Sequence, residues 1–164
     1  MKFSAQEEYG LRCLLAIAKA PEGTSLTIPI ISSMEDLSEP HVAKLLMFLR
    51  KGGFIGSTRG HTGGYFLLRK PREIVVGDVL ESLGGKLYGE GFCDRHSGLS
   101  ANCVHEGDCA VQFLWQEIQD AVDRVIRGLT LEDLLNRRAR PVINGKFHAT
   151  PGHISSAFGK RNTL

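Results

Sequence analysis

The stretch between residues 27 and 52 restricts the possible folds more than any other feature, because two helix patterns follow each other there with a very short turn between them. The first helix is predicted to begin after the N-cap Thr27 and to run to about Asp36. The second is predicted to begin after the N-cap Ser38 and to end at Gly52. Its buried stripe is predicted at Val42, Leu45, Leu46 and Leu49. Two helices joined in this way indicate a helix-turn-helix.

Two short β-prone runs follow these helices. FIGST occupies residues 54–58, YFLLR occupies residues 65–69, and the glycine-rich basic segment RGHTGG joins them, which predicts a β-hairpin. A further helix is expected upstream, because Ser4 to Glu7 have the form of a capping box and Pro21 interrupts the apolar pattern. Three helices followed by a hairpin make a winged helix. The predicted fold class is therefore mainly α with a small β-hairpin.

A long helix is predicted from Val104 or Cys109 to Arg127. Its apolar residues are spaced alternately by three and four positions, at Val111, Leu114, Ile118, Ala121 and Val125. Such a stripe packs either into a core or against a second subunit, and we favour the second because helix-turn-helix proteins normally bind DNA as symmetric dimers. We expect a winged helix-turn-helix domain over residues 1–85, a cysteine-rich loop over residues 86–110, a dimerisation helix with its following turn over residues 104–135, and a basic, flexible tail over residues 136–164.

The net charge of +2 conceals an uneven distribution of charge along the chain. Between Ser38 and Arg72 seven lysines and arginines stand against one acid, whereas between Glu73 and Asn136 twelve acids stand against four basic residues. A basic block of this kind suits a surface that binds phosphates. We expect Ser38, Pro40, His41 and Lys44 of the second helix to face the major groove of DNA, and Arg59, His61 and Thr62 of the hairpin tip to reach a neighbouring groove or the backbone.

Several classes of protein are disfavoured by the sequence. The start MKFSAQEEYGLRCLL has acids where a secretory signal has its apolar run, and no stretch approaches the roughly 18 apolar residues of a membrane span. We therefore expect a cytoplasmic protein without a membrane partner. The sequence shows no pairing of a nucleophile with a base, so we do not expect an enzyme.

Three of the four cysteines lie close together, at Cys93, Cys103 and Cys109, in the spacing C-x9-C-x5-C. In a reducing cytoplasm such thiols are more often metal ligands than disulfides, and thiolates suit both iron-sulfur clusters and zinc. Either group normally takes four ligands, so one ligand is missing. His105 or His96 would complete a zinc site, and the spacing alone does not decide between zinc and a cluster. Cys13 lies in the apolar run CLLAIA and is predicted to be a core residue.

Taken together, these segments resemble the bacterial winged-helix transcriptional regulators that carry an iron-sulfur cluster, the family typified by IscR and NsrR. The resemblance covers about Met1 to Leu135 and is carried by EYGLRCLLAIA, LSEPHVAKLLMFLRKGGFIGSTRGHTGGYFLLRKP, EIVVGDVLESLGG, the three cysteines and LTLEDLL. It implies a homodimeric regulator, in our expectation a repressor, that binds an operator in double-stranded DNA. It also implies a 2Fe-2S or 4Fe-4S cluster that senses iron-sulfur status, redox stress or nitric oxide. The alternative is a zinc-stabilised winged-helix interaction module without redox sensing.

The resemblance also bears on the missing ligand. Some members of the family use a histidine three residues after the last cysteine, where this chain has Gln112. Others use an acidic residue from the first helix of the partner subunit, where this chain has Glu8, so the resemblance implies Glu8 as the fourth ligand. The residues themselves leave other possibilities open. Glu8 is one helical turn from Arg12 and would pair with it on an exposed face. His105 and Asp108 are alternative ligands close to the cysteines.

Overall fold

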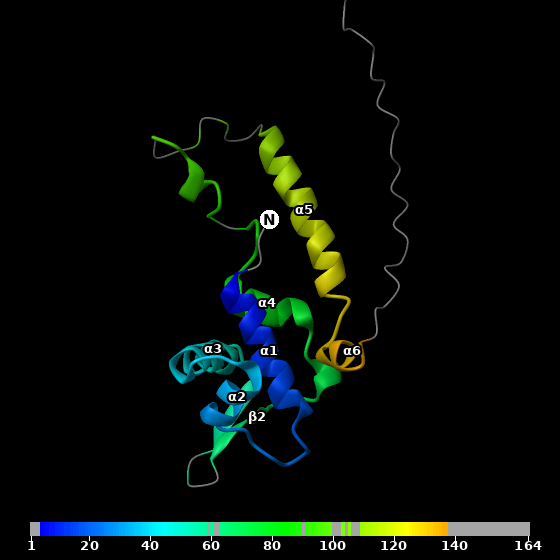
Figure 1. The fold of residues 1–164 in the computed structure, drawn as a ribbon. Helices are drawn as coiled ribbons and strands as arrows, with labels where there is room; N and C mark the ends of the chain where they lie inside the picture. The colour runs from blue at the N-terminus through cyan, green and yellow to red at the C-terminus, as the bar shows by residue number, and fades with distance from the viewer. Residues whose placement is uncertain are drawn as a thin grey trace, which may run out of the picture.

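The computed structural model describes residues 4–58, 60, 63–89, 91–99, 103, 105 and 109–137. The helices are α1 (Ala5–Lys19), α2 (Ile28–Glu35), α3 (Glu39–Lys51), α4 (Val76–Gly84), α5 (Ala110–Ile126) and α6 (Leu131–Leu135), with short 3-10 turns η1 (Pro71–Glu73) and η2 (Asp94–His96). The strands are β1 (Ile55–Thr58) and β2 (Gly64–Leu67). Figure 1 shows α1 to α4 and the hairpin gathered together, with α5 standing away from them. Three helices precede the hairpin, and the predicted winged-helix fold class is confirmed.

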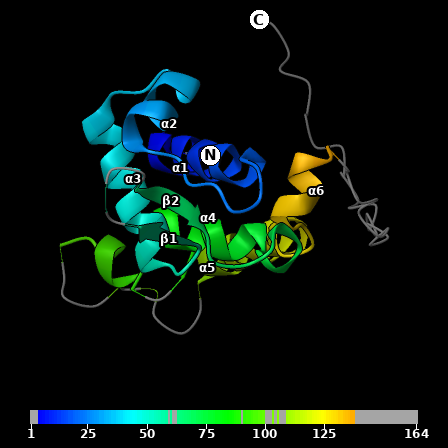
Figure 2. The same cartoon turned by 90° about the horizontal axis from the view of Figure 1, so that it is seen from below.

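Helix α1 lies at the centre of the gathered helices, with α2 and α3 on one side and α6 on the other (Figure 2). The predicted capping box forms at its start. The Glu7 N–H donates to the Ser4 hydroxyl at 3.2 Å, and the Ser4 N–H donates to the Glu7 carboxylate at 2.7 Å. Gly10 marks the place where α1 crosses α4, because a Cβ there would stand 2.5 Å from the Leu83 side chain. A larger residue at position 10 would force the Leu83 side chain to shift.

The predicted helix-turn-helix is formed by α2 and α3. Thr27 caps α2 through its side chain, and Asp36 ends the helix in the left-handed conformation with φ 54°. Ser38 occupies the N-cap position of α3, but its side chain makes no capping hydrogen bond. Ser38 therefore stands at the predicted N-cap position but does not make the hydrogen bond of a cap. The first backbone N–H groups of α3 have no side-chain cap. The predicted stripe of α3 is buried at Val42, Leu45, Leu46 and Leu49.

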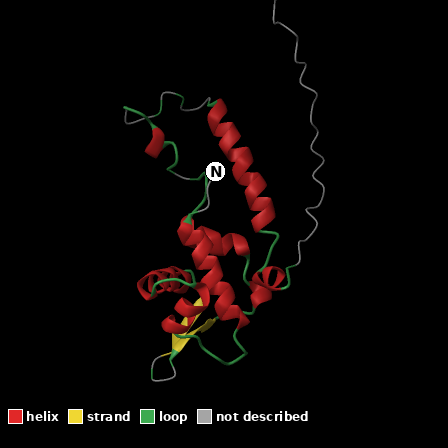
Figure 3. Ribbon diagram, viewed as in Figure 1, coloured by secondary structure: helices red, strands yellow, loops and turns green. Residues whose placement is uncertain are grey.

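The hairpin is the one sheet among the described residues (Figure 3). The strands pair antiparallel, with Ile55 opposite Leu67 and Thr58 opposite Gly64. A short extended segment before α2 adds to this sheet, because Leu26 and Tyr65 exchange backbone hydrogen bonds of 2.9 and 2.8 Å. The hairpin is thus joined to the helix-turn-helix at two places, by the segment before α2 and by the chain that runs from α3 into β1.

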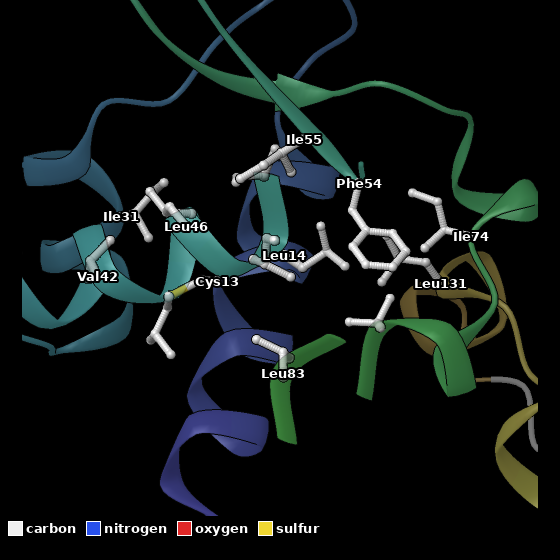
Figure 4. Packing of buried hydrophobic residues seen from close by; sticks show 14 residues of the cluster. Cys13, Leu14, Ile31, Val42, Leu46, Phe54, Ile55, Ile74, Leu83 and Leu131 are labelled. Atoms are coloured by element: carbon white, nitrogen blue, oxygen red, sulfur yellow. The ribbon is translucent and has the colours of Figure 1, made fainter. Parts of the chain in front are cut away.

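The apolar core collects side chains from α1 to α4, β1 and α6 (Figure 4). Its fully buried members include Cys13, which confirms the prediction that this cysteine is a core residue. Burial raises the pKa of the Cys13 thiol to about 11. Leu131 of α6 is buried in the same core, where the Leu131 N–H donates to the Ile74 carbonyl at 2.9 Å. The segment after α5 thus returns to the winged helix.

Helix α5 begins at Ala110 with Cys109 as its N-cap, so the later of the two predicted start points is correct. Its C-terminal end is fixed to α4, because Arg127 forms salt bridges of 3.1 Å with Asp78 and 2.9 Å with Glu81. Most of its predicted apolar stripe is exposed in the single chain, including Val111, Leu114 and Val125 at 56%, 51% and 45%. The stripe is therefore not core packing within one subunit. In the part of the chain that is described, no helix is long and apolar enough to cross a bilayer.

Candidate functional site

One face of α3 is open to solvent along its whole length. Pro40, Lys44, Met47 and Lys51 are all exposed and follow one another at steps of four, three and four residues, which places them on the same face. Ser38 is exposed at the start of this face, and Met47 is 57% exposed. Arg50 and Lys51 border a hollow between α3 and Tyr65 of β2. The expected positions of Ser38, Pro40 and Lys44 thus lie together, and Met47, Arg50 and Lys51 join them.

His41 points in a different direction from these residues. Its side chain is half-buried, and its ring meets the Tyr9 ring edge-on, with centroids 5.6 Å apart and planes at 90°. Tyr9 belongs to α1, so the His41 side chain lies between α3 and α1. A role for His41 in positioning α3 fits this geometry better than contact with a base.

The hairpin tip contains the three remaining residues that we expected near DNA. Arg59, His61 and Thr62 lie outside the described residues. The strand ends beside them are closed by Thr58, whose hydroxyl accepts a hydrogen bond of 3.2 Å from the Gly64 N–H.

The three loop cysteines lie between α4 and α5 and are all half-buried. Cys93 directly precedes η2, and the Cys109 sulfur accepts a hydrogen bond of 3.4 Å from the Gln112 N–H at the start of α5. Among the described residues of one chain, no three histidine, cysteine or acidic side chains lie close enough to hold a metal ion. Of the alternative ligands, His105 is exposed and Asp108 lies outside the described residues.

Tyr88 lies near the start of the cysteine loop and was not among the residues predicted from the sequence. Desolvation raises the pKa of its phenol, a hydrogen bond with Gln112 lowers it, and the charges of Cys93 and Cys109 raise it. The Tyr88 ring packs on Phe92 with centroids 5.1 Å apart, and Phe92 stacks on His96. The sequence signal for this packing is the spacing of Tyr88, Phe92 and His96, each four residues after the last.

Glu8 is exposed in the first turn of α1 and forms no salt bridge with any residue that the structure describes. The pairing of Glu8 with Arg12 is not formed. Arg12 instead binds Glu35 at the end of α2, with its Nε 2.8 Å from the carboxylate and a terminal nitrogen 2.9 Å from the Glu35 carbonyl oxygen. The Arg12 guanidinium also lies 5.5 Å from the centre of the Tyr9 ring. Glu8 is thus available to a ligand or a second subunit.

The donor set fits an iron-sulfur cluster in its chemistry. Three half-buried thiols in one loop and one exposed carboxylate are soft and hard donors of the kind that iron accepts. The zinc arrangement has less support at His96, because its Nδ1 lies 2.7 Å from the Phe92 carbonyl oxygen and its ring stacks on Phe92. Only its Nε2 remains for a metal.

Comparison with known proteins places the chain among regulators of transcription. The family model Rrf2, described as an iron-dependent transcriptional regulator, matches residues 3–137. The chain is 33% identical over 135 residues to protein rrf2 of Nitratidesulfovibrio vulgaris, which covers 82% of this chain and 87% of that relative. It is 32% identical over 139 residues to the regulator NsrR of Geobacillus kaustophilus, which covers 85% and 92%.

The solved structure of CymR, described as the global cysteine regulator of Bacillus subtilis, has the same fold. It matches with a TM-score of 0.66 and 30% identity over 85% of this chain and 99% of that one.

Proposed function

Because the chain belongs to the Rrf2 family of DNA-binding transcriptional regulators, we propose that it is a homodimeric repressor whose affinity for its operator depends on an iron-sulfur cluster. It acts in the cytoplasm and responds to iron-sulfur status, redox stress or nitric oxide. NsrR and CymR are likewise regulators of transcription, in line with the expectation that this chain is not an enzyme.

The exposed face of α3 supports a contact with duplex DNA. Lys44 and Lys51 lie on one face, and the N–H groups at the start of α3 lack a side-chain cap, so that they are open to a phosphate. Arg59, His61 and Thr62 of the hairpin tip are assigned to a second contact along the backbone. Ser38, Pro40 and Lys44 form the part of α3 assigned to the major groove.

The exposed stripe of α5 supports the homodimer. Val111, Leu114 and Val125 leave an apolar seam without a partner in the single chain, and a second α5 crossing it would bury the seam from both subunits. A dimer of this kind carries two copies of α3, as a symmetric operator requires.

The cluster is assigned to Cys93, Cys103 and Cys109 of one subunit and to Glu8 of the partner subunit. The single observation that supports this assignment is the set of three half-buried thiols in one loop, together with an exposed carboxylate on α1 that forms no salt bridge with a described residue. Gln112 occupies the position of the local histidine in other members, so this chain has no local histidine there. When bound, the cluster would supply a centre that reacts with oxidants and nitric oxide.

Two contacts connect α1 to the DNA-binding helices. Arg12, one turn after Glu8, is bound to the end of α2 through Glu35 at 2.8 Å. Tyr9, next to Glu8, meets His41 in the first turn of α3. A ligand bond at Glu8 would hold the first turn of α1, and Arg12 and Tyr9 would connect any shift of that turn to both helices of the helix-turn-helix.

Anaerobic purification of the full chain tests this function. We expect a coloured protein that contains iron and sulfide, loses its colour in each of the variants Cys93→Ala, Cys103→Ala and Cys109→Ala, and binds duplex DNA as a dimer. The matched control is Cys13→Ala, which removes a thiol from the core and leaves the iron content unchanged. A colourless protein with stoichiometric zinc would instead support the zinc-stabilised interaction module.

A further inference from the structure

One large apolar side chain stands on the face of α3 that carries the exposed lysines. Met47 is 57% exposed, and it lies between Lys44, three residues before it, and Lys51, four residues after it. The apolar stripe of α3, in contrast, is fully buried in the core. A single exposed apolar side chain is common on protein surfaces, so the surroundings of Met47 decide whether it has a function.

The hollow between α3 and β2 brings apolar and cationic side chains together beside Met47. It is lined by Ala43, Leu46, Met47, Arg50, Lys51 and Tyr65. Arg50 and Lys51 are exposed in the last turn of α3, and Tyr65 is half-buried on β2. Cations and phenols bind phosphate oxygens, whereas apolar side chains suit the methyl group of a base. The hollow thus offers both kinds of contact that a nucleotide in duplex DNA can use.

The position of Met47 along α3 suits a contact with a base edge. Met47 follows Pro40 by seven residues, and an α-helix rises about 1.5 Å per residue, so the two lie about 10 Å apart along the axis. Neighbouring nucleotides of one DNA strand are spaced by about 3.4 Å, so this face spans roughly three base pairs. Pro40 and Lys44 are assigned to the major groove, and Met47 continues their face to the next base pair.

The chemistry of the thioether side chain selects one base. Thymine alone among the four bases presents a methyl group in the major groove, and apolar side chains read it by direct contact. Methionine is unbranched and polarisable, so it adapts to an irregular apolar surface of this kind. The neighbouring lysines suit phosphate oxygens or guanine instead.

We propose that Met47 is a specificity-determining residue of the DNA surface, which packs against the methyl group of a thymine in each half of the operator. Arg50, Lys51 and Tyr65 hold a backbone phosphate beside that thymine. The inference rests on the proposed contact of α3 with DNA and adds to it one base and the residue that reads it. It does not depend on the cluster.

Replacement of thymine by deoxyuridine tests the contact, because it removes only the methyl group. A duplex is first selected from random sequences with the full-length, anaerobically purified protein, and each of its thymines is then replaced in turn. At one position in each half-site we expect about fourfold weaker binding by the unchanged protein, the factor for one buried methyl group. Met47→Ala should bind the thymine duplex several-fold more weakly and show no further loss with deoxyuridine at that position. Its salt slope should match that of the unchanged protein, because no charge is lost.

The matched control is Met34→Ala, which removes the same side chain from α2, where Met34 is 52% exposed. This variant should bind as the unchanged protein does and keep the full response to deoxyuridine. The inference is overturned if no replacement weakens binding by the unchanged protein, or if Met47→Ala responds to the same extent. A protein that selects no duplex would defeat the proposed function together with this inference. A colourless protein that selects a duplex would defeat only the cluster, and the thymine replacements would still decide the role of Met47.

Discussion

Cys13 and the loop cysteines carry the same side chain in opposite surroundings. Cys13 is fully buried among apolar side chains of the core, and its thiol stays protonated to a higher pH than usual. The loop cysteines are half-buried in a polar segment of the chain. Burial therefore makes one thiol a packing residue, whereas position in a polar loop makes the others candidate ligands.

The raised pKa of Cys13 predicts a loss of stability in alkali. The folded chain holds the thiol proton up to about pH 11, whereas the ordinary value is 9.0, so the stability gained from the neutral thiol is complete below about pH 9 and lost as the pH rises through about 11. Cys13→Ala should cost about 1 to 2 kcal/mol at pH 7 through the cavity it leaves. The free energy of unfolding of the Cys13→Ala variant, measured in urea, should then fall less steeply between pH 9 and pH 11 than that of the unchanged protein. Parallel pH curves for the two proteins would contradict the burial argument.

His41 and Lys44 are neighbours in α3 that we expect to act differently. Lys44 is exposed, and Lys44→Ala should reduce the slope of log affinity against log salt concentration by about 0.9, the effect of one lost phosphate contact. His41 contacts Tyr9, so His41→Ala should lower the melting temperature and leave the salt slope unchanged. DNA titrations at several salt concentrations and thermal unfolding of both variants separate the two roles. A change of base preference in His41→Ala without loss of stability would place His41 on DNA after all.

Among the secondary-structure elements, α5 has the least contact with the rest of its own chain. It is fixed at its lower end by Arg127 and in its middle by Gln119, and its apolar stripe stays exposed. An exposed seam of this kind on a fixed helix is what a second subunit would cover.

The seam can be tested by a charge at its centre. Leu114→Lys should convert the dimer to a monomer, as measured by light scattering, because it places a cation where two copies of α5 meet. Gln116→Lys is the matched control on the opposite face, where the new cation lies one turn from Asp120, and it should remain dimeric. A Leu114→Lys protein that stays dimeric would show that the subunits meet elsewhere.

The elements that were predicted well are those whose signals are local. The capping box at Ser4, the apolar stripe of α3 and the glycine-rich hairpin each follow from residues a few positions apart, and the structure confirms them. The hydrogen bond from the Tyr88 N–H to Gln119 depends on how distant parts of the chain come together, because the two residues are 31 positions apart. Spacing within the sequence does not contain that information.

In the candidate site, too, the residue types could be predicted from the sequence, whereas the contacts between distant residues could not. The three cysteines and Glu8 were visible as residue types, whereas the partner of Arg12 was not, because Glu35 lies 23 residues further along the chain. Ser38, Pro40 and Lys44 are exposed, as a DNA contact requires, but the inward direction of His41 depends on Tyr9 in another helix.

At the scale of the whole molecule, the proposed function needs three regions to act together. The exposed face of α3 would contact DNA, α5 would form the dimer, and α1 would connect Glu8 to the helix-turn-helix through Arg12 and Tyr9. The basic block lies in the segment of α3 and the hairpin, whereas the following segment with α5 is acidic. The negatively charged backbone of DNA would therefore attract the winged helix and repel the segment that contains α5.

The central claim is that Glu8 of one subunit completes the site formed by the cysteines of the other, and a mixed dimer tests it most directly. One subunit carries Glu8→Ala with its cysteines intact, and the other carries Cys93→Ala, Cys103→Ala and Cys109→Ala with Glu8 intact. Two affinity tags isolate this pair, and the half-life of its iron-sulfur absorbance in air is compared with those of the unchanged dimer and the Glu8→Ala homodimer. The account predicts a labile Glu8→Ala homodimer and a mixed dimer that retains one cluster as stable as in the unchanged protein. A Glu8→Ala homodimer as stable as the unchanged protein, or a mixed dimer as labile as that homodimer, would contradict it.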